Sequence, residues 1–198
     1  MGRVIFGGII GGIIAFVWSF VSWAILPWHD WTFQSFKNED FVAWVIKENV
    51  KKDGVYIIPH MGDEKAALAS KDFKETLDEE KKALKEGPFV YAQIKRKGMD
   101  ITSPKYYIIS FLTQFIGAAL ISFLLLKATE SSYGGRLLFV TVIGLIVGVL
   151  GMIPDWNWFG AGSLFVLVMI ADLIITWFLA GLIMAAVVKP KPERDLMM

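Results

Sequence analysis

The sequence predicts a helical membrane protein: a bundle of four transmembrane helices with a small α/β domain inserted between the first helix and the second. Three observations predict this class. Of 198 residues, 55% are hydrophobic, and the mean hydropathy of +0.53 exceeds that of ordinary soluble domains. Four apolar stretches approach the roughly 20 residues that a helix needs to cross a bilayer core. A long polar stretch with mixed helix and strand patterns separates the first from the second.

The apolar stretches define the predicted membrane helices, which cover residues 4–28, 105–127, 137–154 and 163–188. A buried helix of a soluble protein could imitate one such run, but this chain has too little other sequence to cover all of them. The first run is also longer than the apolar core of a signal peptide, which is about 7–15 residues, and no A-x-A site follows it. We therefore expect it to be retained as a helix.

The polar stretch, residues 29–104, is predicted to form a small α/β domain. Asn38 and the two acidic residues after it begin a helix pattern, and residues 64–86 carry a second one. Each is followed by a strand pattern, at residues 55–58 and 89–95. Two strands alone make a sheet of little stability, so we expect this domain to pack against membrane-proximal aromatic residues or a partner.

Basic residues near the helix ends predict the orientation, because they concentrate on the cytoplasmic side of a membrane. All those in short segments fall on one side: Arg3, Lys127, Arg136, Lys189, Lys191 and Arg194. Aromatic residues gather at the opposite ends of the helices: Trp23, Trp28, Trp31, Tyr106, Tyr107, Trp156 and Trp158. We expect both termini, including the tail 189–198, to be cytoplasmic and residues 29–104 to lie outside.

Pairs of glycines four residues apart occur in two of the predicted membrane helices and allow another helix to approach closely. The first helix carries Gly7, Gly8, Gly11 and Gly12, and the third carries Gly144 and Gly148. These glycines predict helix packing. Packing inside the chain and contact with another subunit both fit the pattern.

Asp172 is the one ionisable residue inside the predicted span 163–188, where an acidic side chain costs a few kcal/mol unless it faces a partner or water. Counting about 1.5 Å per residue puts it in the outer half of the bilayer, at a depth comparable with Gln114 and Ser19. A polar binding site formed by these three residues is therefore predicted. One interpretation is a proton or ion relay or a ligand site, and the other is a structural hydrogen bond between helices.

The remaining chemistry suggested by the sequence is sparse. His29 and His60 could contribute to a copper or zinc site, but their separation matches no ligand motif, and turn or interface roles are the alternative. The chain has no cysteine, and its net charge of +1 does not suggest nucleic acid as a partner. Nucleotide-binding and common catalytic motifs are missing from the sequence, so we expect neither a cofactor nor an enzyme of a familiar type.

Several short motifs resemble those of small bacterial inner-membrane proteins that have four transmembrane helices and no assigned function. The motifs are Leu26–His29 (LPWH), Gly54–Pro59 (GVYIIP), Gly87-Pro88, Trp156-Asn157-Trp158 and Trp177–Gly181. The resemblance implies a location in the bacterial inner membrane, with residues 29–104 in the periplasm. We expect a non-enzymatic accessory, scaffold or assembly component whose partners are the lipid bilayer and either itself or another membrane complex. A small oligomeric transporter or ion-conducting protein that uses Asp172 is the main alternative.

Overall fold

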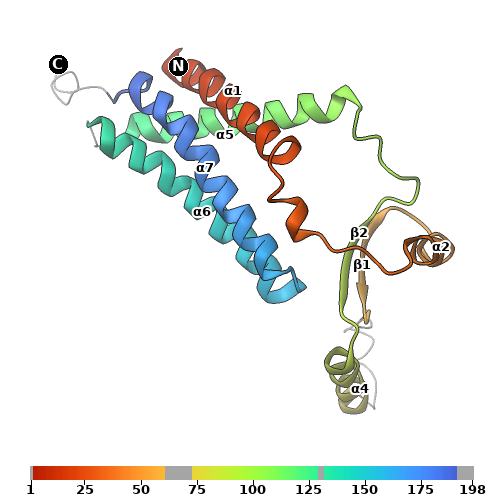
Figure 1. Ribbon diagram of the computed structural model, residues 1–198. Coiled ribbons are helices and arrows are strands. Elements are labelled where there is room, and N and C mark those ends of the chain that lie inside the picture. The colour runs from red at the N-terminus through yellow and green to blue at the C-terminus, as the bar shows by residue number, and fades with distance from the viewer. Residues whose placement is uncertain (1, 61–72, 129–131, 191–198) are drawn as a thin grey trace. The chain divides into compact units, whose positions relative to one another are not determined.

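A computed structural model describes residues 2–60, 73–128 and 132–190 (Figure 1). The chain divides into two compact units. The helical unit contains the chain up to Gln34, then Asp100–Trp156, and then the chain from Ala161 onward. The second unit contains Ser35–Met99 and Asn157–Gly160. The prediction of a mainly helical chain with a small two-stranded sheet is confirmed.

Within the described residues, four helices are long and apolar enough to cross a membrane, as expected of a multi-pass membrane protein. They are α1 (Gly2–Ala24), α5 (Pro104–Lys127), α6 (Tyr133–Phe159) and α7 (Ser163–Val187). Their outward side chains are large and apolar. On α5, for example, the exposed residues include Ile108, Leu112, Ile116, Leu120 and Phe123. Such faces suit hydrocarbon, because a helix satisfies its backbone hydrogen bonds internally.

Three helix boundaries differ by at least four residues from those predicted, and one of them is the start of α6, which lies at Tyr133 rather than at residue 137. The first helix ends at Ala24 rather than at Trp28, because the amides of Ile25 and Leu26 both donate to the Val21 carbonyl and Pro27, which has no amide hydrogen, follows. The third membrane helix, α6, continues through Pro154 to Phe159. A proline removes one intrahelical hydrogen bond but does not always end a membrane helix.

Glycines bring the membrane helices into close contact. A Cβ atom added to Gly12 would lie 2.8 Å from the Cα of Phe115 on α5, and one added to Gly11 would lie 2.5 Å from the sulfur of Met184 on α7. Gly7 and Gly8 are equally crowded by α5 and α7. On α6, the crowded positions are Gly144 against Trp177 and Gly148 against Ile170. The chain's own helices therefore cover every glycine face that the sequence singled out.

The second unit contains α2 (Glu39–Asn49), β1 (Gly54–Ile58), α4 (Phe73–Glu86) and β2 (Val90–Ile94). The side chain of Asn38 accepts a hydrogen bond from the Phe41 amide and caps α2. The two strands pair antiparallel, with Gly54 opposite Ile94 and Ile58 opposite Val90. Residues 64–72 of the second predicted helix lie outside the described residues.

Asp53 links the two strands at one end of the two-stranded sheet. Its carboxylate accepts hydrogen bonds from the Arg96 amide at 3.0 Å and from the Lys95 ammonium at 3.3 Å. These two donors favour the ionised form and hold the pKa of Asp53 below its ordinary value of 3.8. The carboxylate therefore joins the residue before β1 to the residues after β2.

Candidate functional site: a buried polar network between α1 and α7

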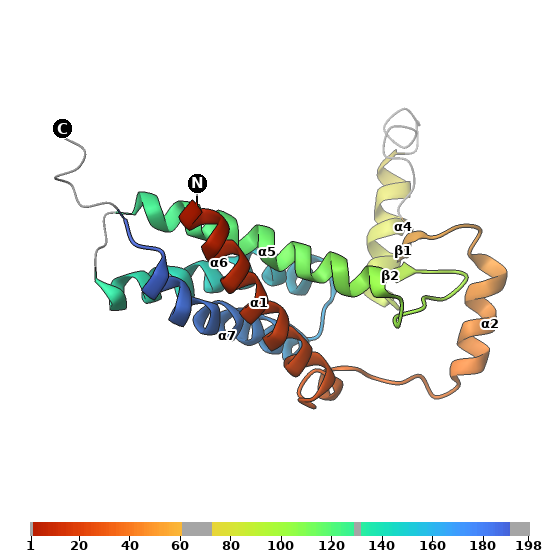
Figure 2. The ribbon, with the colours of Figure 1, turned by 90° about the horizontal axis from the view of Figure 1, so that it is seen from above.

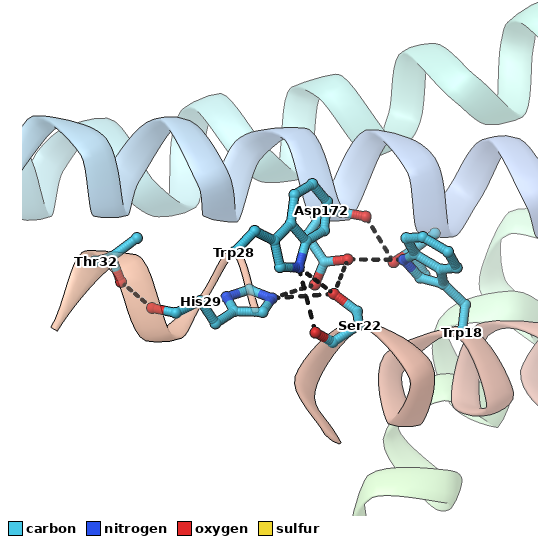
Figure 3. Close-up of polar contacts among 7 residues, drawn as sticks. Trp18, Ser22, Trp28, His29, Thr32 and Asp172 are labelled. Carbon is cyan, nitrogen blue, oxygen red and sulfur yellow. Dashed lines mark hydrogen bonds and ion pairs between the residues drawn. The ribbon is translucent and has the colours of Figure 1, made fainter. Parts of the chain in front are cut away.

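The carboxylate of Asp172, on α7, lies at the centre of a buried polar network (Figure 3). Its Oδ1 atom accepts hydrogen bonds from the Trp18 indole at 2.7 Å and from the Ser22 hydroxyl at 2.8 Å. Its Oδ2 atom lies 3.5 Å from Nε2 of His29. All three partners come from α1 or from the turn that follows it, so the network joins this end of α1 to α7.

The local sequence explains why these partners meet. Trp18 and Ser22 are four residues apart on α1 and therefore share a face of the helix. The chain then turns back over the last turn of α1, where the Trp28 indole donates to the Ser22 hydroxyl at 3.0 Å. A short 3₁₀ helix, η1 (Asp30–Thr32), follows, and both the amide and the hydroxyl of Thr32 donate to the His29 carbonyl. These bonds fix the backbone that carries the imidazole.

His29 is enclosed by aromatic rings and is only 1% exposed. Its imidazole stacks on the indole of Trp23, with ring centroids 3.8 Å apart and planes 7° from parallel. The Trp28 indole meets it edge-on at 5.4 Å. An imidazole in such a site is shielded from water.

The hydrogen bonds of Ser22 assign the protonated nitrogen of His29. A hydroxyl donates one hydrogen, and that of Ser22 goes to Asp172. Ser22 must therefore accept at its contact of 3.0 Å with Nε2 of His29, so Nε2 carries a hydrogen. The other ring nitrogen, Nδ1, is buried and has no hydrogen-bond partner in the described part of the chain. A neutral His29 thus keeps a free lone pair at Nδ1.

This geometry differs from that of a nucleophilic triad. In a Ser-His-Asp triad the serine and the carboxylate contact opposite nitrogens of the imidazole, and the serine gives its proton to the histidine. Here Ser22 and Asp172 both lie beside Nε2, and the Ser22 proton points to the carboxylate.

The structure does not place Ser19 and Gln114 in the network of Asp172. Ser19 lines a groove between α1 and α5, and Gln114 is half-buried on α5 without a hydrogen bond to any described residue. His60 is exposed and belongs to the second unit, whereas His29 belongs to the helical unit. Among the residues described, no group of three or more His, Asp or Glu side chains could hold a metal ion.

Trp18, Ser22 and His29 were not predicted as partners of Asp172, nor was Trp28 predicted as a partner of Ser22. The four-residue spacing of Trp18 and Ser22 was the available signal, because both side chains can donate a hydrogen bond from one face of α1. No protein-family model, curated protein or solved structure matches this chain. The proposed function therefore rests on the geometry of the described residues.

Proposed function

We propose that this chain is a non-enzymatic component of a membrane complex, in which the helical unit anchors the second unit for contact with itself or another protein. One observation carries the proposal. Asp172 is held by Trp18, Ser22 and His29 within the chain, so its hydrogen bonds are used to fix α1 against α7. An acceptor satisfied in this way suits a structural role in the membrane.

The surface of the second unit supports this proposal. Phe36, Phe41 and Trp44 are each more than half exposed, and the rings of Phe41 and Trp44 lie 6.0 Å apart. Exposed aromatic side chains that lie together are typical of protein contact surfaces. The strands β1 and β2 pair only with each other among the described residues, which leaves an outer edge on each for further pairing.

Photo-crosslinking in native membranes tests the proposal. A benzophenone amino acid at Trp44 should give an adduct of one discrete mass, because this position faces the proposed partner. The same amino acid at Lys82, an exposed position on α4, is the matched control and should give none. If Trp44 gives no protein adduct and the solubilised chain is a strict monomer, the proposal is wrong.

We also propose a bacterial inner membrane location with cytoplasmic termini. Contacts between the basic ends of the helices support it: Arg3 donates to the Lys189 carbonyl at 2.9 Å, and Arg136 donates to the Ala185 carbonyl at 2.8 Å. The starts of α1 and α6 thus lie beside the end of α7 (Figure 1). Arginine and lysine at one end of a bundle favour the cytoplasmic side.

Cysteine labelling in spheroplasts tests this orientation, because the chain has no native cysteine. A cysteine replacing Glu79 should react with a membrane-impermeant thiol reagent in intact spheroplasts. One replacing Lys189 should react only after permeabilisation. The reverse pattern would place the second unit in the cytoplasm.

A second candidate function is proton or ion movement. The His29 imidazole favours it, because its Nε2 lies beside Asp172 while its buried Nδ1 has no hydrogen-bond partner among the described residues. Reconstituted chain should then carry a proton flux that Asp172→Asn abolishes. An anchoring role predicts no flux in either protein. The same assay on Gln114→Leu provides a control, because Gln114 makes no hydrogen bond to the network.

A further inference from the structure

We propose that a groove between α1 and α5 binds one anionic glycerophospholipid of the surrounding membrane. The groove has a volume of about 310 Å³ and is formed by the last two turns of α1 and the segment from Ile101 to Ser110. All of its lining residues belong to the helical unit. This site is separate from the proposed protein contact surface around Trp44.

The groove follows from the distribution of small and large residues along α1. At the start of the helix, Gly8 and Gly12 lie against Ala119 and Phe115, so the two backbones approach closely. One turn later, Phe16 meets Phe111 edge-on, with ring centroids 5.8 Å apart. Beyond this aromatic pair the helices diverge (Figure 2). The large side chains at this point hold the two helices apart, and this separation leaves the groove between them.

The lining combines apolar rings with hydroxyl groups. On α1 it contains Phe16, Phe20 and Trp23, and near the start of α5 it contains Tyr106 and Tyr107. Ser19 and Ser110 add two further hydroxyl groups. Phe16 and Trp23 are seven residues apart, so the groove extends about 10 Å along α1. Apolar rings and hydroxyl groups together suit the acyl and glycerol regions of a phospholipid.

Charge favours an anionic headgroup near the start of α5. The ammonium of Lys105 lies over the ring of the lining residue Tyr106, 4.8 Å from its centroid. No carboxylate is among the residues that line the groove. The groove opens between helices long and apolar enough to span a membrane, where phospholipids are the neighbouring molecules. A bilayer lipid can therefore enter it from the side.

The chain provides a matched control for the role of Lys105. Lys127, at the other end of α5, also lies over an aromatic ring, with its ammonium 6.0 Å from the centroid of Phe123. It is not part of the groove. Lys105→Gln and Lys127→Gln therefore remove the same charge and the same type of ring contact, but only the first is next to the proposed site.

Native mass spectrometry of the purified full chain with phosphatidylglycerol or phosphatidylcholine tests the proposal. Wild type should retain one phosphatidylglycerol in preference to phosphatidylcholine. Lys105→Gln should weaken that retention about fivefold, the effect of one lysine near an anionic headgroup, and Lys127→Gln should leave it unchanged. Ser110→Leu or Ser19→Leu, which fill the groove from opposite walls, should reduce retention of both lipids while the circular dichroism spectrum stays unchanged.

Four outcomes would overturn the proposal. Absence of a retained lipid would mean that only exchanging annular lipid touches the groove. Equal losses of phosphatidylglycerol retention in Lys105→Gln and Lys127→Gln would indicate a nonspecific effect of charge. Unchanged retention in both folded leucine variants would place the lipid elsewhere. Displacement of the lipid by inorganic phosphate would show that the site recognises free phosphate.

Discussion

Replacing Asp172 should distinguish hydrogen-bond acceptance from negative charge as the source of its structural contribution. In Asp172→Asn, the side-chain oxygen can still accept from Trp18 and Ser22, and only the negative charge beside His29 is lost. In Asp172→Leu, the part-buried indole of Trp18 and the buried hydroxyl of Ser22 lose their acceptor. An orphaned donor costs about 1–3 kcal/mol, so the leucine variant should lose about 2–6 kcal/mol of unfolding free energy. The asparagine variant should lose about 1 kcal/mol or less.

The assay is equilibrium unfolding of the purified chain in mixed micelles by titration with sodium dodecyl sulfate, followed by far-ultraviolet circular dichroism. Ser19→Ala is the control, because Ser19 lies one turn of α1 from Ser22 but makes no hydrogen bond to Asp172. It should unfold at the same detergent fraction as wild type. Equal destabilisation by asparagine and leucine would show that charge is decisive. A leucine variant as stable as wild type would show that the network does not hold α1 against α7.

Three further predictions concern other parts of the structure. Gly12→Ala should lower stability by about 1–3 kcal/mol because its Cβ would meet the Phe115 backbone, whereas Gly151→Ala, with open space around it, should not. The folded-state pKa of Asp53 is depressed. Its contribution to the stability of the folded state should therefore be complete above pH 3.8 and be lost as the pH falls through the lowered pKa. Carboxyl carbon-13 NMR can measure that pKa. Ser22→Ala should lower the unfolding free energy more than Ser19→Ala, because it removes a hydroxyl that contacts three side chains.

The membrane helices could be predicted because hydropathy and length depend only on the local sequence. Their ends were harder to predict. Residues 25–28 are as apolar as the helix before them, yet Pro27 and the fold-back of Trp28 remove them from α1. Pro154 has the opposite effect, since the sequence suggested a helix end where α6 continues. In both cases the surrounding structure, rather than the hydropathy, sets the boundary.

The candidate site was only partly predictable for a geometric reason. The cost of burying a carboxylate identified Asp172, and counting residues gave its depth. Counting does not give the direction around the helix axis. Ser19 and Ser22 differ by three residues, which places them about 60° apart around α1. Ser22 faces α7, whereas Ser19 faces the groove beside α5.

Two stripes of residues along α1 explain this difference. One contains Gly11 against Met184 of α7 and continues in steps of four, three and four residues through Ala15 and Trp18 to Ser22. The other contains Gly8 and Gly12 against α5, and it continues through Phe16 and Ser19 to Trp23. The spacing of both stripes is visible in the sequence. Their assignment to α7 and α5 requires the three-dimensional packing.

Trp23 connects the two stripes at the end of α1. Its indole stacks on His29 of the polar network and also lines the groove. A substitution at Trp23 therefore perturbs both sites and cannot separate their effects. Lys105 and Ser110 are associated with the groove alone, whereas Ser22 and Asp172 belong to the network alone. Combining one substitution from each pair measures the coupling between the sites, and a coupling free energy above about 0.5 kcal/mol would mean that a change at one site reaches the other, as the shared contact of Trp23 predicts.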